Sequence, residues 1–213
     1  MISILQDIGL YRQTVNRFAE PIPAVFLDRD GVIVEETNYL HRTADVRMIS
    51  GAGRAIARLN QAAIPVVLVT NQAGVGRGYY TWTEFEAVQQ YIEAAILRDG
   101  AHLDGVWACG YHPAGSGPLA KDHLWRKPQP GMLTDAAECL CIDLARSWLV
   151  GDKISDLEAG IAGGLAGMIL VRTGYGTTHE PHVAVLQAHP SQRLVVADDL
   201  SHAIDQILSH SRL

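Results

Sequence analysis

Cysteine, positive charge and long apolar runs are all scarce in this chain of 213 residues. Three cysteines are too few for a disulfide framework and odd in number, so they indicate a reducing compartment and a cytoplasmic location. The net charge of −6 argues against the broad basic surface of a general nucleic-acid binder. No stretch approaches the ~20 apolar residues that span a bilayer, and the first residues lack the pattern of a secretory signal. We therefore expect neither nucleic acid nor a membrane as a partner.

What the chain does contain is the composition of a globular protein with a real core. Hydrophobic residues make up 48% of the chain and charged residues 19%, and the length suits one substantial α/β domain. Between Ile4 and Phe18, apolar residues recur at roughly helical intervals, and Pro21 and Pro23 end the pattern. We expect residues 1–23 to form an appended helix and residues 24–213 to form the main domain.

After residue 24, apolar β-branched runs alternate with amphipathic helical patterns. The predicted strands are residues 25–28, 66–70, 106–109, 148–151, 168–171 and 194–196. The predicted helices are residues 51–62, 83–98, 130–141, 155–162 and 201–209. This alternation is typical of a parallel sheet covered on both faces, a three-layer, Rossmann-like α/β fold. Since no insertion is long enough for a substantial cap domain, we expect open access to the sheet edge.

Polar side chains gather where the predicted strands end, although burying charge beside a core strand is costly unless something binds there. In such folds, ligands lie beyond the carboxyl ends of the strands. The residues at these ends, together with the basic pair that closes the long loop 110–128, are Asp28, Asp30, Thr70, Asn71, Arg126, Lys127, Asp152 and Lys153.

The chemistry of this set suggests a metal ion and a phosphoryl group. Three carboxylates at one edge repel each other unless a cation lies between them, and hard oxygen ligands suit Mg²⁺. Arg126 offers a bidentate fork and Lys127 a point charge for the remaining phosphoryl oxygens. Asp28 is then the candidate nucleophile, forming an aspartyl-phosphate, and Asp30 the candidate general acid and base. Arg29, on the opposite face of an extended chain, is not expected to enter the site.

Four segments, "FLDRDG", "VVLVTNQ", "RKPQPGM" and "VGDKISD", resemble in order and spacing the four motifs of the haloacid-dehalogenase-like (HAD-like) phosphatases. The fuller pattern over residues 24–174, with "TNQAGVGRGYY", "YHP" and "VRTG", is similar to the D-glycero-D-manno-heptose-1,7-bisphosphate phosphatases and, less closely, to the histidinol-phosphate phosphatases. The resemblance implies Mg²⁺-dependent hydrolysis of a small phosphorylated sugar, with heptose 1,7-bisphosphate cleaved at its C7 phosphate as the best match. We expect a monomer or a small homo-oligomer.

The resemblance also implies roles for the matching residues. It repeats the assignments of Asp28 and Asp30, and it adds Asp152 and the backbone carbonyl of Asp30 as Mg²⁺ ligands beside Asp28. The residues implied to act on the phosphoryl group are Thr70, Asn71 and Lys127. The residues implied to bind substrate are Glu36, Thr37, Asn38, Tyr39, Asn71, Gln72, Arg126 and Lys153. The segment "ETNY" at 36–39 departs from the acid-x-Gly-Tyr pattern of the family.

The long loop departs from the family as well. Its members carry zinc there, on a Cys-x-His pair and a later Cys-x-Cys pair. In this chain Tyr111 replaces the histidine, and His123 and Trp125 stand where the two later cysteines belong. A closed zinc site needs four ligands, whereas Cys109, His112 and His123 supply at most three. We therefore do not expect zinc, and we expect Trp125 with the loop's glycines and prolines, or bound substrate, to order the loop.

Several alternatives stay open at this point. Asp156 either favours the positive end of its helix or acts near the metal or Lys153, and Arg77 either reaches the ligand or lies on the surface. A receiver-type signalling module would also be phosphorylated on an aspartate, but it has no use for a turnover acid such as Asp30. A phosphotransferase or mutase on the same fold is a third possibility, and the missing cap favours hydrolysis over it.

Overall fold

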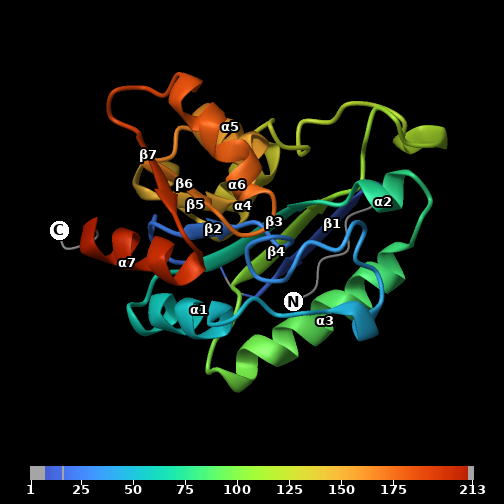
Figure 1. The fold of residues 1–213 in the computed structure, drawn as a ribbon, viewed down its shortest axis with the longest axis horizontal. Helices are drawn as coiled ribbons and strands as arrows, with labels where there is room; N and C mark the ends of the chain where they lie inside the picture. The colour runs from blue at the N-terminus through green and yellow to red at the C-terminus, as the bar shows by residue number, and fades with distance from the viewer. Residues whose placement is uncertain (1–7, 16, 211–213) are drawn as a thin grey trace.

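The computed structural model describes residues 8–15 and 17–210, and a seven-stranded sheet runs through its centre (Figure 1). The strand order is β1-β4-β3-β2-β5-β6-β7. Six strands are parallel, namely β2 (Val25–Leu27), β3 (Val66–Asn71), β4 (Gly105–Cys109), β5 (Trp148–Gly151), β6 (Gly167–Val171) and β7 (Arg193–Ala197). Each lies where the apolar runs predict a strand, which confirms the α/β fold class.

Helices cover both faces of the sheet, as Figure 1 shows. The helices on one face are α1 (Ala52–Gln61), α3 (Trp82–Arg98) and α7 (Leu200–His210). Those on the other are α4 (Gly131–Leu140) and α5 (Ile154–Ala162). The short helices in the connections are α2 (Ala73–Gly76), α6 (Gly176–His179), η1 (Thr43–Asp45), η2 (Gly117–Leu119), η3 (Leu144–Arg146) and η4 (Glu180–Val185). The three predicted layers are confirmed. None of the described helices is long and apolar enough to cross a membrane.

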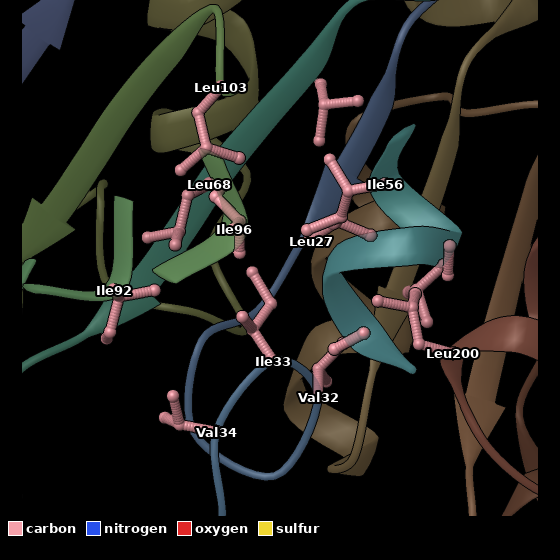
Figure 2. Close-up of a cluster of buried hydrophobic side chains, with 14 of the residues drawn as sticks. Leu27, Val32, Ile33, Val34, Ile56, Leu68, Ile92, Ile96, Leu103 and Leu200 are labelled. Carbon is pink, nitrogen blue, oxygen red and sulfur yellow. The ribbon is translucent and has the colours of Figure 1, made fainter. Parts of the chain in front are cut away.

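The central strand β2 is held by packing on both of its faces. Val25 and Leu27 join the cluster beneath α1 and α3, whereas Phe26 joins the cluster beneath α4 and α5. Figure 2 shows Leu27 of β2 and Ile56 of α1 in the first cluster. Burying one such side chain contributes roughly 1.5–3 kcal/mol. The packing therefore fixes the strand whose carboxyl end carries the acids of the first motif.

The N-terminal segment adds a strand where a helix was expected. The expectation is wrong over Leu10–Thr14, which form the edge strand β1, antiparallel to β4; residues 4–7 and 16 lie outside the described residues. The open edge of β4 presents backbone N–H and C=O groups that a strand pairs with and a helix cannot. The side chain of Tyr11 also packs edge-on against Phe85 of α3, with ring centroids 5.1 Å apart. The segment thus extends the sheet of the main domain.

The order of the strands reverses at β2. From β2 the chain continues to β3 and β4 on one side, and β5, β6 and β7 follow on the other. Such a reversal opens a crevice beyond the carboxyl ends of the strands, and ligands bind there in open α/β sheets. The residues that follow β2, β3 and β5 therefore meet at one place.

Candidate active site

A tight turn directly after β2 carries both acids of the first motif. The N–H group of Ile33 donates to the carbonyl of Arg29 (2.9 Å), which closes the turn. Gly31 has a φ of +84°, and a Cβ at this position would lie 2.2 Å from Asp152 Oδ2, so the turn requires glycine. Figure 2 shows the side chains of residues 32–34 directed into the core. The turn is therefore anchored by apolar packing immediately beyond its acids.

Lys127 lies buried at the floor of the site, where its ammonium contacts two carboxylates and a backbone carbonyl. Its Nζ is 2.9 Å from Asp28 Oδ1 and 2.6 Å from Asp156 Oδ1, and it donates to the carbonyl of Val69 (2.9 Å). The amide of Asn71 exchanges two hydrogen bonds with the backbone of Lys127 (2.9 and 3.0 Å). Burial alone would lower the pKa of Lys127, but the carboxylates of Asp156 and Asp28 raise it, so the ammonium stays charged. Asn71 thus holds Lys127 in place.

Gln72 joins the ends of β2 and β3. Its Nε2 donates to Thr70 Oγ1 (2.9 Å) and to Asp30 Oδ2 (3.2 Å). Its Oε1 accepts from Arg29 Nη2 (3.3 Å) and from the hydroxyl of Tyr80. All four hydrogen-bonding positions of the amide are occupied. Although Gln72 lines the cavity, its polar atoms therefore serve other site residues.

Arg29 enters the site, contrary to the sequence expectation. Its side chain is fully buried, and its Nε and Nη2 donate to both carboxylate oxygens of Asp30 at 2.9–3.1 Å. The alternation of a strand stops at Leu27, and the turn that follows brings Arg29 beside Asp30. Burial raises the pKa of Asp30; Arg29 opposes this shift, and the carboxylate of Asp28 adds to it. Asp30 therefore keeps a proton to a higher pH than an ordinary aspartate.

Three buried carboxylates, those of Asp28, Asp152 and Asp156, each offer an oxygen within 4.8 Å of the others. Asp152 Oδ2 accepts from the N–H group of Tyr175 (2.8 Å), whereas Oδ1 is buried with no hydrogen-bond partner among the described residues. Burial, followed by the charge of Asp28, raises the pKa of Asp152 to about 8. Oxygen ligands that repel each other and include an orphaned atom fit a hard divalent cation such as Mg²⁺.

Asp156 combines the two positions that the sequence offered as alternatives, because it lies in the first turn of α5 and also faces the site. Its Oδ1 contacts the ammonium of Lys127, and its Oδ2 accepts from the backbone N–H group of Lys153 (3.0 Å). Both oxygens of Asp156 have partners on this chain, so Asp28 and Asp152 are the carboxylates better able to ligate a cation. The only signal in the sequence was its position, one helical turn after Asp152.

A cavity of about 540 Å³ opens over these side chains, within the range of small-molecule sites. The sequence-predicted residues that line it are Asp28, Asp30, Glu36, Asn38, Tyr39, Thr70, Asn71, Gln72, Arg126, Lys127 and Lys153. Two predicted residues do not line the cavity. Thr37 is exposed on the surface outside it, and Asp152 is fully buried beneath its floor. The lining residues that the sequence analysis missed are Arg29, Leu40, Ala73, Tyr80, Pro128, Ser155 and Tyr175.

The loop at 36–39 forms part of the rim. Glu36 pairs with Lys153 (3.2 Å), and the hydroxyl of Tyr175 donates to Asn38 Oδ1 (3.1 Å). Asn38 and Tyr39 both have a left-handed backbone, with φ of +53° and +65°. Aromatic and polar side chains from two segments therefore lie together over the cavity. One segment is the connection between β2 and α1, and the other follows β6.

Aromatic stacking orders the long loop 110–128. The rings of Tyr111 and His123 stack with centroids 4.5 Å apart, and Lys121 Nζ lies 4.8 Å from the Tyr111 ring. Trp125 is buried in the cluster beneath α4, and its backbone N–H group donates to His123 Nδ1 (3.0 Å). The burial of Trp125 is consistent with the contribution expected from it, whereas the stack was not foreseen.

Comparison with protein families places the chain among phosphatases. A family model for HAD-hydrolase-like proteins matches residues 124–203. The chain is 48% identical over 150 residues to the D-glycero-beta-D-manno-heptose-1,7-bisphosphate 7-phosphatase of Mesorhizobium japonicum, covering 70% of this chain and 69% of that protein. Identity to the enzyme of the same name from Escherichia coli is 38% over 163 residues, or 76% of this chain and 85% of the relative.

Two solved structures share the fold at similar levels of identity. A HAD-like phosphatase from Mesorhizobium loti superposes with a TM-score of 0.83 at 38% identity, covering 96% of this chain and 94% of the other. The D,D-heptose 1,7-bisphosphate phosphatase from B. bronchiseptica, complexed with magnesium and phosphate, gives a TM-score of 0.76 at 30% identity. That match covers 89% of this chain and 100% of the other.

Proposed function

The chain belongs to the HAD-like phosphatase family that contains the heptose-1,7-bisphosphate 7-phosphatases, and we propose that it hydrolyses the C7 phosphate of D-glycero-D-manno-heptose 1,7-bisphosphate. One observation carries the proposal. A buried Asp28–Lys127 pair, with their atoms 2.9 Å apart, lies at the floor of a cavity that also presents Asp30 and Thr70.

In the first half-reaction, a carboxylate oxygen of Asp28 attacks the phosphorus. The bond between phosphorus and the C7 oxygen breaks, and an aspartyl-phosphate forms. Two negative groups at ~4 Å repel by about 4 kcal/mol per pair of unit charges at an effective dielectric of ~20. Lys127 offsets this repulsion because its ammonium is charged and already in contact with Asp28.

Asp30 handles the proton in both half-reactions. It donates to the leaving C7 alkoxide, and it then takes a proton from the water that attacks the phosphorus and releases inorganic phosphate. Its raised pKa suits the first step, and the Arg29 fork stabilises the carboxylate needed for the second. Gln72 keeps Asp30 and Thr70 in one network.

A divalent cation fits the carboxylates below the cavity. Asp28 and Asp152, with the backbone carbonyl of Asp30, would hold Mg²⁺, and Oδ1 of both aspartates is buried with no hydrogen-bond partner among the described residues. When bound, the ion shields the charge of the phosphoryl group. We further propose a cytoplasmic location, since the chain has only three cysteines and none of them is paired in a disulfide.

The experiment that tests the function is a comparison of phosphate release from several phosphomonoesters under saturating Mg²⁺. We expect kcat/KM for heptose 1,7-bisphosphate to exceed that for histidinol phosphate and for simple hexose phosphates by at least about tenfold, a difference of ~1.4 kcal/mol. A preference for histidinol phosphate would overturn the choice of substrate and leave the phosphatase assignment standing. Stoichiometric labelling without turnover would instead indicate a receiver-type module.

A further inference from the structure

Residues 173–175, which follow β6 closely, take no part in the chemistry above, although the motif "VRTG" ends within them. In the sheet, β5 lies between β2 and β6. A segment that joins the end of β6 to the turn after β2 must therefore pass the end of β5, where Asp152 lies. Residues 173–175 make this connection through two hydrogen bonds, one to Gly31 and one to Asp152.

The first hydrogen bond fixes the turn after β2. Thr173 Oγ1 donates to the carbonyl of Gly31 (2.6 Å). On the other side of the same residue, the N–H group of Gly31 donates to the carbonyl of Val34 (2.7 Å). In a planar trans peptide the C=O group points opposite to the N–H group, so the bond to Val34 also sets the direction of the Asp30 carbonyl. The peptide groups on both sides of Gly31 are therefore held.

The second hydrogen bond fixes the carboxylate of Asp152. The backbone N–H group of Tyr175 donates to Asp152 Oδ2 (2.8 Å), whereas Oδ1 has no hydrogen-bond partner in the part of the chain that the structure describes. This bond restricts rotation of the carboxylate and leaves Oδ1 as the oxygen that is available to a cation.

Gly174 brings the two hydrogen bonds into one packed contact. Its φ is +57°, and a Cβ at this position would lie 2.3 Å from Asp152 Oδ2 and 2.6 Å from the Cα of Gly31. Only glycine combines this backbone conformation with so close an approach. The main chain after β6 therefore packs directly against both the turn after β2 and the side chain that follows β5.

The two segments that this contact joins carry like charges. Asp28 and Asp152 each offer a carboxylate oxygen to the same cluster, within 4.8 Å of each other. Without a cation between them, their repulsion favours separation of the turn after β2 from the end of β5. The hydroxyl of Thr173 holds the turn from the far side of β5 and opposes that separation.

We propose that Thr173 is a positioning residue for Mg²⁺, whose hydroxyl holds the Gly31 peptide, and with it the Asp30 carbonyl, in place before the ion binds. The inference rests on the proposed function, which supplies the ligands Asp28, Asp152 and the Asp30 carbonyl. Groups that hydrogen-bond to metal ligands orient them, and their loss weakens metal affinity by about 10- to 100-fold. The lower end applies to Thr173, because it acts through an intervening peptide group.

The test uses three variants of the full chain. Thr173→Val keeps the branched shape of the side chain and removes the hydroxyl. Thr173→Ser keeps the hydroxyl and removes the methyl group. Thr177→Val is the matched control, because the Thr177 hydroxyl also donates to a backbone carbonyl, that of Arg172 (3.1 Å), in the same segment. Titration calorimetry of the metal-free protein with Mg²⁺ gives Kd without turnover.

We expect Thr173→Val to raise the Kd for Mg²⁺ by about tenfold. Thr173→Ser and Thr177→Val should stay within about twofold of the wild type. The Mg²⁺ concentration for half-maximal phosphate release should rise in Thr173→Val by the same factor as Kd, and excess Mg²⁺ should restore most of the rate.

An unchanged Kd in Thr173→Val would overturn the inference, and a lowered Tm would then show that the hydroxyl stabilises the fold alone. A Kd raised equally in Thr173→Ser would also overturn it, because the shape of the side chain would then matter and not its hydroxyl. The proposed function is judged separately. A wild type that binds Mg²⁺ but releases no phosphate from the bisphosphate would overturn that function, while the Kd values would still decide the role of Thr173.

Discussion

The floor and the rim of the cavity differ in how fully their polar side chains are hydrogen-bonded. On the floor, all four hydrogen-bonding positions of the Gln72 amide are engaged, and the ammonium of Lys127 contacts two carboxylates and a backbone carbonyl of the same chain. At the rim, Arg77 Nε has no partner among the described residues, and Nε2 of His112, whose Nδ1 accepts from the N–H group of Ala114, faces another donor, Arg77 Nη2. Buried polar groups whose donors and acceptors are filled keep one geometry. The hydrogen bonds of the floor therefore fix its side chains more tightly than those of the rim do.

Asp28→Asn, a substitution on the floor of the cavity, has the largest expected effect on activity. We expect kcat to fall by about 10⁵-fold or more, because an amide oxygen is a far weaker nucleophile and the two-step route is lost. Steady-state phosphate release under saturating Mg²⁺ measures the effect, and circular dichroism checks that the fold is retained. Retention of most of the activity would show that the nucleophile lies elsewhere.

Gln72→Leu tests whether the floor acts by positioning Asp30. We expect kcat/KM for a sugar phosphate, which reports the first half-reaction, to fall by about 10²-fold, the lower end of what general acid catalysis contributes. The loss should shrink below about tenfold for 4-nitrophenyl phosphate, whose leaving group needs no proton. Gln89→Leu, a buried glutamine on α3 that bonds Glu93, is the matched control. An equal loss with both leaving groups would mean that Gln72 supports the fold alone.

Asp152→Asn separates metal binding from folding. The folded pKa of Asp152, about 8, lies above its unfolded value, so this carboxyl destabilises the metal-free protein increasingly as pH rises from about 4 to about 8. The metal-free variant should therefore have a Tm about 2–4 °C above that of the wild type at pH 8. This shift corresponds to ~1 kcal/mol in the free energy of unfolding for a domain of this size, and the difference in Tm should vanish near pH 4. Mg²⁺ should raise the Tm of the wild type alone. Equal Mg²⁺ shifts in both proteins would contradict the assignment.

Tyr111→Leu has the smallest expected effect and probes the rim. Loss of the stack on His123 should lower the free energy of unfolding by about 1 kcal/mol, as for other aromatic pairs, which urea titration measures.

Elemental analysis of protein purified without chelator should find no stoichiometric zinc. One zinc per chain would instead mean that a metal orders the loop.

The contrast between floor and rim also explains what the sequence could predict. Strands β2 to β7 were predictable because their apolar runs are nearly continuous. Asp28, Asp30 and Asp152 were predictable because they follow those strands in recognisable motifs, and Lys127 because a recognisable motif closes the long loop. Strand β1 was not, because the apolar spacing of its short segment fits a helix as well as an edge strand.

The hydrogen-bond partners of the polar side chains could not be predicted from the sequence. Asn71 and Gln72, which were expected to bind substrate, line the cavity, and their amides also hold Lys127 and Asp30, which the sequence did not indicate. Arg29 was expected to point away, because the turn that redirects it depends on packing after Gly31. Such choices depend on contacts between distant segments, and no local pattern encodes them.

The most direct test of the account is a crystal structure with Mg²⁺ and beryllofluoride, a mimic of the aspartyl-phosphate. We predict a beryllium–oxygen bond to the carboxylate of Asp28, with the ammonium of Lys127 against a fluoride. Beryllofluoride bound to another side chain, with both oxygens of Asp28 bare, would contradict the covalent route and the reaction built on it.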